Sequence, residues 1–204
     1  TLCIYNPLNK KEIITKSKIK PKINFIKKKV NLINVGRFTD QKDQITIIKA
    51  VNLIKNKISL QLTIVGRGKE EENLKKFINN NNLNGLVRLV NFTNNPYNLI
   101  NSSDIFILSS LYEGLPNVLL ESQVLKKFII STNCPTGPKE ILMNGKAGFL
   151  FKPKDYKNLA KLIIYAYKNK SKLKKMCNLG YKNLFRFDYN KNVKKYYSTI
   201  NSIL

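Results

Sequence analysis

Short apolar runs rich in β-branched residues alternate with longer amphipathic stretches along this chain, and this alternation limits the possible folds more than any other feature. Six runs are expected to form strands: Val30–Val35, Leu60–Val65, Val87–Val90, 104–108, 128–131 and Phe149–Phe151. The stretches that follow them are expected to form helices: 41–57, 69–80, 95–102, 116–125, 137–143 and 155–167. Strands that alternate with helices build a parallel sheet covered on both faces. The sequence therefore predicts an α/β fold with a doubly wound sheet of six parallel strands.

The rest of the chain lies outside this central region. Residues 7–29 show no clear period and hold most of the early lysines, so the interval 1–29 is expected to be a hinge and connecting segment, whose opening TLCIYNP resembles the end of a buried strand. Residues 30–169 are expected to form the sheet domain and residues 170–204 two further helices. The second of these helices would carry four apolar residues on one face: Val193, Tyr196, Tyr197 and Ile200. Since the chain has neither a starting Met nor a secretory pattern, we expect a fragment of a longer polypeptide.

The chain is strongly basic, with 37 Lys and Arg residues against 12 Asp and Glu and a formal charge of +25. Clustered cations of this kind bind phosphate backbones. All but four of the basic residues are lysines, however, and they are scattered without the repeated aromatic residues on which bases stack. Composition therefore argues against a nucleic-acid partner, although a basic nucleic-acid-binding module stays as an alternative. Attraction to an anionic membrane surface fits the charge better.

Residue types that are missing or rare exclude several kinds of chemistry. The chain has no histidine, which removes imidazole catalysis, Ser-His pairs and most catalytic zinc sites. Its three widely spaced cysteines match neither a disulfide framework nor a zinc site, as in a protein of the reducing cytoplasm. No apolar run approaches the ~18 residues that cross a bilayer. The chemistry must therefore use carboxylates, cations and backbone amides.

A glycine and two cations follow the first expected strand. Gly36 and Arg37 close the strand, and Lys42 comes five residues later at the start of the next helix. Glycine lets the backbone approach a ligand closely, and a helix N-terminus with two cations suits a diphosphate. The alternative is a turn glycine beside solvated surface cations. Two of the four arginines follow glycine at strand ends, where lysine cannot replace the planar guanidinium, and this favours a phosphate site.

The second glycine-arginine pair lies in Gly66-Arg67-Gly68, at the end of the second expected strand. A phosphate contact and a tight turn before a helix are equally good explanations for it. The segment is not a dinucleotide fingerprint, because the third glycine is missing and no acidic residue ends the next strand. An NAD-dependent enzyme is therefore disfavoured.

The segment LYEGLPNVLLES, residues 111–122, places two glutamates eight positions apart in an otherwise uncharged stretch. Glu113 is expected in the loop before a helix and Glu121 about a turn and a half inside that helix. Gly114 would let the chain pass close under a ligand. Carboxylates at this spacing are suited to accept hydrogen bonds from sugar hydroxyls, with a phosphate held at the helix mouth between them. The alternative is a loop acid favoured by the helix dipole and a surface glutamate.

Together, GRF with its following lysine, VGRG and EGLPNVLLE resemble the donor-binding half of glycosyltransferase family 4, retaining enzymes of the GT-B fold. The resemblance covers roughly residues 30–164, and the family's signature of two glutamates separated by seven residues is met by Glu113 and Glu121. It implies a Rossmann-like domain in which Arg37 and Lys42 bind the donor diphosphate and stabilise the leaving nucleotide. It further implies that Glu113 holds hydroxyls of the donor sugar and Glu121 those of the ribose.

The same resemblance implies further contacts. Backbone contacts around sugar and phosphates would come from four residues: Gly114, Leu115, Asn117 and Val118. Phe92, at the end of the third expected strand, would form a wall of the base pocket. The family works without a bound metal or other cofactor, in agreement with the lack of an Asp-x-Asp motif here. The loop STNCPTGPKE, residues 131–140, resembles a subgroup that builds surface polysaccharides or lipid-linked oligosaccharides, which implies a UDP-sugar donor and a glycan or polyprenyl-diphosphate-linked acceptor.

The chain departs from the family in one respect. Complete members have a first nucleotide-fold domain that binds the acceptor, and these 204 residues contain nothing that replaces it. We therefore expect a chain that binds a nucleotide sugar weakly and transfers no hexosyl or N-acetylhexosaminyl group by itself. A sugar-nucleotide epimerase or hydrolase on the same scaffold stays as an alternative. The expected location is the cytoplasm, with peripheral contact at the inner face of the cell membrane.

Overall fold

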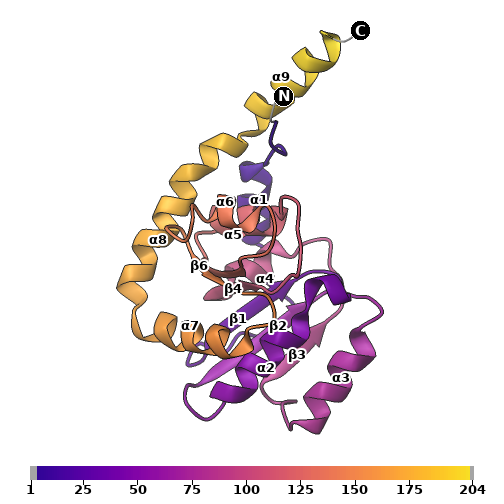
Figure 1. Cartoon of the computed structure of the whole chain (residues 1–204), viewed down its shortest axis with the longest axis vertical. Helices are drawn as coiled ribbons and strands as arrows, with labels where there is room; N and C mark the ends of the chain where they lie inside the picture. Colours follow the sequence, from indigo (N-terminus) through magenta and orange to yellow (C-terminus); the bar gives the residue numbers. More distant parts are fainter. Residues whose placement is uncertain (1–3, 203–204) are drawn as a thin grey trace.

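The computed structural model describes residues 4–202, and its strands form one six-stranded sheet (Figure 1). The strands are β1 (Val30–Val35), β2 (Leu60–Val65), β3 (Val87–Val90), β4 (Ile105–Leu108), β5 (Phe128–Thr132) and β6 (Phe149–Phe151). Neighbouring strands are parallel and follow the order β3-β2-β1-β4-β5-β6. The expected doubly wound sheet is confirmed, and every strand lies within one residue of its expected bounds.

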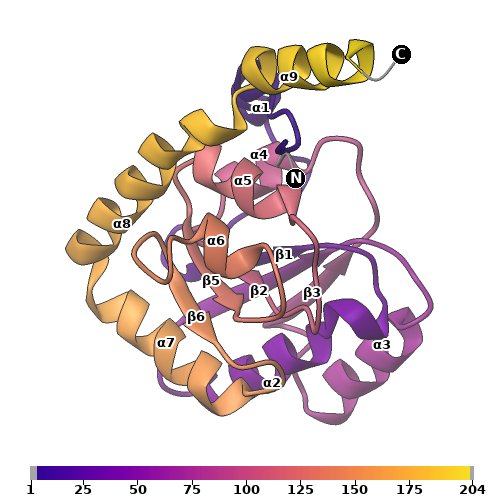
Figure 2. The same cartoon turned by 45° about the horizontal axis from the view of Figure 1, so that its top comes forward.

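Helices cover both faces of this sheet (Figures 1 and 2). The α-helices in the described part of the chain are α1 (Lys10–Ser17), α2 (Gln44–Ile54), α3 (Glu71–Asn80), α4 (Tyr97–Asn101), α5 (Asn117–Val124), α6 (Pro138–Ile141), α7 (Tyr156–Lys168), α8 (Lys170–Asn183) and α9 (Tyr189–Asn201). Two 3-10 helices, η1 (Asp40–Lys42) and η2 (Leu184–Phe187), accompany them.

The core consists of two layers, one on each face of the sheet. Successive strand residues point to opposite faces, so Leu32 and Ile107 enter one layer while Ile33 and Phe106 enter the other. The first layer packs against α2, α3 and α7, and the second against α1, α4, α5 and α6. Because both faces are buried, β4 and β5 are apolar along nearly their whole length, which made them recognisable in the sequence.

The strand order reverses between β1 and β4. From β1 the chain moves outward through β2 to β3, then returns to β4 on the other side of β1 and continues to β6. The helix after β1, α2, packs on one face, and the helix after β4, α5, packs on the opposite face. The loops that lead to these helices therefore diverge at the carboxyl ends of β1 and β4. Ligands of doubly wound sheets bind at this switch point.

Helix boundaries differ from the expected ones most clearly after β1. The single helix expected over 41–57 is split into η1 and α2, and α2 ends at Ile54. Asp43, between the two, has a φ of 44°, a left-handed conformation that interrupts the helical hydrogen-bond ladder. Lys42 consequently lies in η1, ahead of the α-helix and not in its first turn. The helix expected over 137–143 is also shorter, because α6 ends at Ile141.

The interval before β1 contains a helix that the sequence analysis did not expect. Helix α1 packs against α4 and α5 through the buried Ile13. Asn9 caps it by accepting a hydrogen bond from the Glu12 amide at 3.1 Å. The expected strand end in TLCIYNP is wrong for residues 4–7, which belong to no strand, and residues 1–3 lie outside the described residues.

Two terminal helices follow the sheet domain, as expected. Helix α8 runs along the side of the molecule from α7 to α9 (Figures 1 and 2). The four apolar residues expected on one face of α9 are all exposed, from Val193 and Tyr196 at 39% to Tyr197 at 69%. The Tyr196 hydroxyl donates to the Ile4 carbonyl at 3.4 Å, so α9 meets the start of the described chain. Between residues 4 and 202 no helix is both long and apolar enough to span a membrane.

Candidate functional site

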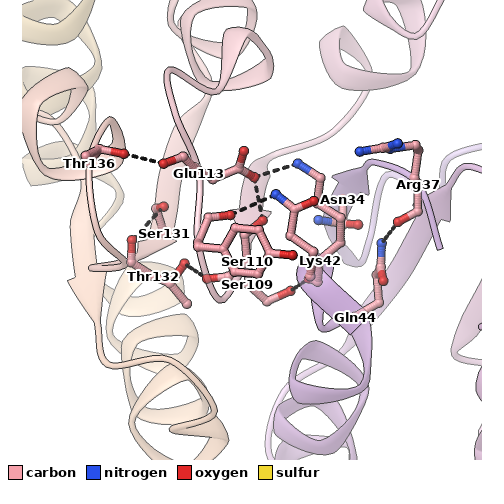
Figure 3. A network of polar contacts seen from close by, with 12 residues as sticks. Asn34, Arg37, Lys42, Gln44, Ser109, Ser110, Glu113, Ser131, Thr132 and Thr136 are labelled. Carbon is pink, nitrogen blue, oxygen red and sulfur yellow. Dashed lines mark hydrogen bonds and ion pairs between the residues drawn. The ribbon is translucent and has the colours of Figure 1, made fainter. Parts of the chain in front are cut away.

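The loops after β1 and β4 bring a cation and a carboxylate together at the switch point. The Nζ atom of Lys42, in η1, lies 2.6 Å from Oε1 of Glu113, in the loop between β4 and α5 (Figure 3). The side chains are 17% and 8% exposed, respectively, so the ion pair is largely shielded from water. A pair in this setting is stronger than a solvated one, because a lower effective dielectric increases the attraction.

Serine hydroxyls hold this pair in place. Ser110 donates to the same Glu113 Oε1 at 2.6 Å, and Ser109 donates to the Lys42 carbonyl at 2.7 Å. The Leu111 amide also donates to the Gln41 carbonyl at 2.8 Å. These bonds join the β1 loop directly to the β4 loop. These contacts within the protein hold the floor of the site in place.

Asn34 connects the two strands beneath this floor. The register of β1 with β4 covers only Leu32 with Ile105 and Ile33 with Phe106, so the strands separate toward their carboxyl ends. Asn34, which is 2% exposed, donates from Nδ2 to the Ile107 carbonyl at 2.8 Å across this gap (Figure 3). The side-chain bond links the two strands beyond their last paired residues.

Arg37 follows the carboxyl end of β1, at the same edge of the sheet as the ion pair. Its side chain is exposed and extends toward Lys42 in Figure 3. Its backbone is held by Gln44, whose Nε2 donates to the Arg37 carbonyl at 2.8 Å. A Cβ on Gly36 would lie 3.6 Å from Cδ of Lys42, so the Lys42 stem passes directly over Gly36. The expected group of Gly36, Arg37, Lys42 and Glu113 is therefore brought together.

The glycines of the β2 loop have a packing role. A Cβ on Gly66 would lie 2.0 Å from the Gly36 carbonyl oxygen and 2.8 Å from the Phe38 ring. Gly68, with a φ of 154°, passes similarly close to the Phe38 backbone. The β1 and β2 loops thus pack backbone against backbone. This packing supports the tight-turn explanation of the Gly66 segment, and a phosphate contact there stays a prediction.

Arg67 and Phe92 meet at the ends of β2 and β3. The Arg67 guanidinium carbon lies 5.2 Å from the centroid of the Phe92 ring, in a cation–π arrangement. Phe92 is 57% exposed. An exposed ring beside an exposed guanidinium offers a flat surface on which a planar group can stack. The structure therefore pairs two residues that were expected to contact the donor separately.

Gly114 differs from the glycines of the β2 loop because no protein atom demands it. A Cβ built on Gly114 would meet nothing within 4 Å. Its carbonyl oxygen, by contrast, would lie 2.0 Å from a Cβ on Gly137, whose φ is 64°. Thr136 donates to the Glu113 carbonyl and so fastens the β5 loop over the same segment (Figure 3). One side of Gly114 is thus packed, and the other faces open space.

Glu121 lines a cavity between α1, α4 and the start of α5. The cavity has a volume of 180 Å³ and is lined by Pro7, Leu8, Asn9, Glu12, Ile13, Tyr97, Asn117 and Glu121. Burial raises the pKa of the Glu121 carboxyl from 4.5 to about 7, and hydrogen bonding by Tyr97 opposes this shift. Burial also raises the pKa of Tyr97, to about 12. Helix α1 covers Glu121, whereas the sequence analysis placed this residue simply inside a helix.

The remaining expected contacts lie around the start of α5. Asn117, the first residue of α5, is exposed. Its side-chain oxygen accepts a hydrogen bond from Asn6 Nδ2 at 3.3 Å. Leu115 and Val118 are half-buried and pack against the second core layer. Within residues 4–202 no three Cys, Asp or Glu side chains are grouped as metal ligands would be.

Several positioning residues were not singled out from the sequence. Ser109, Ser110 and Asn34 hold the loops in place through side-chain hydrogen bonds that span 67, 3 and 73 positions in the sequence. Tyr97 lines the cavity around Glu121. The available signal was their position, since polar residues at the ends of buried strands face a switch-point crevice.

Comparison with known proteins identifies the family. The model of the family described as "Glycosyl transferases group 1" matches residues 15–183. The chain belongs to the group 1 glycosyl transferases. It is 38% identical over 144 residues to an uncharacterised glycosyltransferase of Methanocaldococcus jannaschii, over 64% of this chain and 36% of the relative. A second relative is an N-acetylgalactosamine-N,N'-diacetylbacillosaminyl-diphospho-undecaprenol 4-alpha-N-acetylgalactosaminyltransferase of Campylobacter jejuni. The two are 31% identical over 119 residues, which cover 58% of this chain and 32% of the relative. The matches thus span about a third of each relative's length.

Solved glycosyltransferase structures share the fold of this chain. A glycosyltransferase from Rickettsia africae superposes with a TM-score of 0.88 at 21% identity, over 99% of this chain and 57% of that one. Anabaena HepE in complex with UDP superposes with a TM-score of 0.85 at 20% identity, over 98% of this chain and 57% of HepE. This chain therefore has the Rossmann-like fold found in one part of these larger GT-B proteins.

Proposed function

We propose that this chain is the nucleotide-sugar-binding half of a retaining, metal-independent glycosyltransferase. The observation that carries the proposal is the shielded contact between Lys42 and Glu113, with Arg37 beside it, at the carboxyl ends of β1 and β4. Membership of the group 1 glycosyl transferases supports it. An acceptor-binding half supplied by additional polypeptide would complete the enzyme.

The two cations would bind the diphosphate of the donor. Arg37 is exposed and available, while Lys42 would exchange part of its contact with Glu113 for a phosphate oxygen. As the bond to the sugar breaks, negative charge would develop on the leaving diphosphate, and the two cations would stabilise it. The bonds from Ser109 and Ser110 keep Lys42 and Glu113 close to this position, which limits the reorganisation needed during the reaction.

The carboxylates and the loops would bind the polyol parts of the donor. Glu113 would accept hydrogen bonds from the sugar, and Glu121 from the ribose inside the cavity beside Asn117. The open side of Gly114 would admit sugar and phosphate against the backbone, with contacts from Leu115, Asn117 and Val118. The Arg67–Phe92 pair would stack on the base, with Gly66 beneath it.

A UDP-linked hexose or N-acetylhexosamine is the donor that the comparisons favour. The Anabaena structure contains UDP, and the name of the Campylobacter relative describes transfer of N-acetylgalactosamine to a diphospho-undecaprenol-linked acceptor. We infer a glycan or polyprenyl-diphosphate-linked acceptor for the complete enzyme. A lipid-linked acceptor would place the enzyme in the cytoplasm at the inner face of the membrane, and the charge of +25 would favour that contact.

Calorimetry with UDP tests this proposal. We expect Arg37→Ala and Glu121→Ala each to weaken binding by ~1.5–3 kcal/mol, the range for a lost charge-assisted hydrogen bond. Lys76→Ala, on the exposed surface of α3, is the control and is expected to leave affinity unchanged. Unchanged affinity in both site variants, with the fold intact by circular dichroism, would refute the assignment.

A product assay separates binding from transfer. The 204-residue chain with UDP-sugar and a polyprenyl-diphosphate-linked acceptor is expected to form no glycosylated product, because the proposed acceptor-binding half would lie outside these residues. Release of an epimerised sugar would instead favour an epimerase. Binding of oligonucleotides that is insensitive to Glu121→Ala would favour the nucleic-acid alternative.

A further inference from the structure

A large cavity opens at the amino ends of the strands, on the edge of the sheet opposite the candidate donor site. It has a volume of 610 Å³, within the range of ~300–1,000 Å³ that is usual for small-molecule sites. Val30, Ile105 and Phe128, the first residues of β1, β4 and β5, lie in its wall. We call it the amino-edge cavity; its other lining residues are Phe25, Lys27, Lys28, Lys29, Asn31, Ser102, Asp104, Lys126, Ala166, Tyr167, Lys170, Leu173, Lys174 and Cys177.

Six lysines line this cavity, and only one carboxylate accompanies them. The lysines come from three separate segments: the chain before β1, the turn before β5 and the start of α8. The carboxylate, Asp104, is engaged in the fold, because its Oδ2 accepts a hydrogen bond from the Asn31 amide at 2.8 Å. Among residues 4–202 none of the six lysines forms an ion pair. The cavity therefore gathers positive charge that the described chain does not neutralise.

The overall abundance of lysine does not account for this cluster. The cavity beside α2 and α3, with 390 Å³, is lined by two lysines, Lys49 and Lys154. The cavity around Glu121 and the neighbouring one lined by Gly114 and Thr136 have none in their linings. The three smaller cavities together contain two lysines, against six in the amino-edge cavity. The amino-edge cavity is therefore selectively cationic.

Aromatic rings and apolar side chains also line the wall, beside the polar Asn31, Ser102 and Asp104. Phe25 and Phe128 contribute rings, and Leu173 and Ala166 contribute aliphatic surface. Tyr167 lies under Lys170, whose Nζ is 5.9 Å from the ring centroid. Lys126 is similarly placed over Tyr181 at 4.7 Å. The Lys170 contact holds one ammonium group against a ring of the cavity wall, whereas Tyr181, the partner of Lys126, lies outside the lining.

We propose that the amino-edge cavity binds a small anion in which a phosphate or diphosphate group is joined to an apolar portion. The ammonium groups at the rim would bind the phosphate oxygens, as compact point charges suited to this anion. The apolar portion would occupy the wall formed by Phe25, Phe128 and Leu173. Such a molecule is available from two sources, a membrane phospholipid or a free organic phosphate. The site is separate from the donor site, since it lies at the other ends of β1 and β4.

Calorimetry with dihexanoyl phosphatidic acid, below its critical micelle concentration, tests this inference. The cavity variant is Lys28→Gln/Lys126→Gln/Lys170→Gln, with one change from each segment of the rim. The control variant, Lys20→Gln/Lys76→Gln/Lys191→Gln, removes the same charge from equally exposed lysines outside the cavity. We expect about tenfold weaker binding in the cavity variant and less than a twofold change in the control. Equal losses in the two variants would overturn the proposal, because net charge alone would then explain binding.

Two further probes test the chemistry of the ligand. Pyrophosphate is expected to bind more weakly than dihexanoyl phosphatidic acid, since it lacks the apolar portion. Equal affinity for the two would overturn the amphiphilic part of the proposal. UDP is expected to bind both variants as it binds the wild-type chain and not to displace the phosphatidic acid. Competition by UDP would show that the phosphatidic acid occupies the donor site, which would also overturn the inference.

Vesicles identify the source of the ligand. Flotation with phosphatidylcholine vesicles that contain phosphatidylglycerol is compared for the wild-type chain and both variants. A selective loss of flotation in the cavity variant assigns the site to a membrane lipid. If the two variants float equally while soluble phosphatidic acid still distinguishes them, the site is assigned to a free organic phosphate.

Discussion

Nζ of Lys42 and Oε1 of Glu113 lie 2.6 Å apart, although the two residues belong to loops on opposite sides of the point where the strand order reverses. Ser110 adds a second hydrogen bond to the same carboxylate oxygen. The contact therefore joins the β1 loop to the β4 loop. It places a cation beside a carboxylate at the carboxyl ends of these strands, where we propose that diphosphate and sugar bind.

Breaking this contact should destabilise the chain. Lys42→Met leaves the shielded Glu113 carboxylate with a partner lost, which costs ~1–3 kcal/mol of the free energy of unfolding. In a double-mutant cycle with Glu113→Gln, we expect the two changes to be non-additive by ~0.5–3 kcal/mol. Urea denaturation of the four proteins measures the coupling. Additive effects would show that the ion pair contributes nothing of its own.

Gly114→Ala should affect ligand binding and leave stability unchanged. A Cβ there meets no protein atom within 4 Å, so we expect the free energy of unfolding to stay within ~0.5 kcal/mol of wild type. If the donor passes against this position, the added methyl should weaken UDP-sugar binding by ~1–3 kcal/mol.

Gly85→Ala is the matched control for this test, because a Cβ on Gly85 also meets nothing within 4 Å and Gly85 lies away from the site, just before β3. Calorimetry with UDP-sugar compares the two variants. Equal affinities for Gly114→Ala and the wild-type chain would remove Gly114 from the donor site.

Gly66→Ala, in contrast to Gly114→Ala, should lower the stability of the chain. Its Cβ would lie 2.0 Å from the Gly36 carbonyl oxygen, so the β1 and β2 loops would have to separate. We expect a loss of ~1–3 kcal/mol or more in the free energy of unfolding, as for an overpacked core position. Guanidinium denaturation against Gly114→Ala measures it. A fully stable variant with impaired UDP binding would instead assign Gly66 a ligand contact alone.

Glu121 should make stability depend on pH. Its folded pKa of about 7 lies above the unfolded value near 4.5, because burial disfavours the charged form. The unfolded state therefore loses its proton first, and the favourable contribution of the neutral carboxyl is complete below pH 4.5 and lost as pH rises through about 7. This difference in pKa corresponds to about 3 kcal/mol of the free energy of unfolding.

The neutral variant Glu121→Gln isolates this effect. Relative to wild type, it should gain stability between pH 5 and pH 8, because an amide never has to ionise in the buried position. Urea denaturation of both proteins at the two pH values gives the difference. A constant difference between variant and wild type across this range would show that Glu121 does not titrate as described.

The strands could be predicted closely because their signal is local: runs such as IFIL and FIIS are buried on both faces and contain no polar residue before their ends. The contact of Lys42 with Glu113 depends on the strand order, in which β1 and β4 are neighbours, and strand patterns in the sequence do not give that order. Helix α1 was missed because its eight residues include only two buried ones, Ile13 and Ser17. A helix this short is stabilised by packing on α4 and α5 and not by its own sequence pattern.

The missed helix also explains the environment of Glu121. Its distance in sequence from α1 exceeds 100 positions, so no local pattern could indicate the covered cavity or its effect on the pKa. Similarly, the split between η1 and α2 depends on the left-handed backbone of Asp43, a residue type that also occurs inside helices. Contacts between distant segments, and single backbone angles, were thus the parts that sequence patterns could not supply.

The contact between Gly137 and the Gly114 carbonyl restricts how this region can be redesigned. A side chain at Gly137 would collide with the preceding loop, so libraries that vary residues 113–117 to change substrate choice must leave Gly137 intact. A side chain at Gly114 itself meets no protein atom, so that position can be varied singly. A replacement at Gly137, by contrast, would need a compensating change in the loop at 113–117.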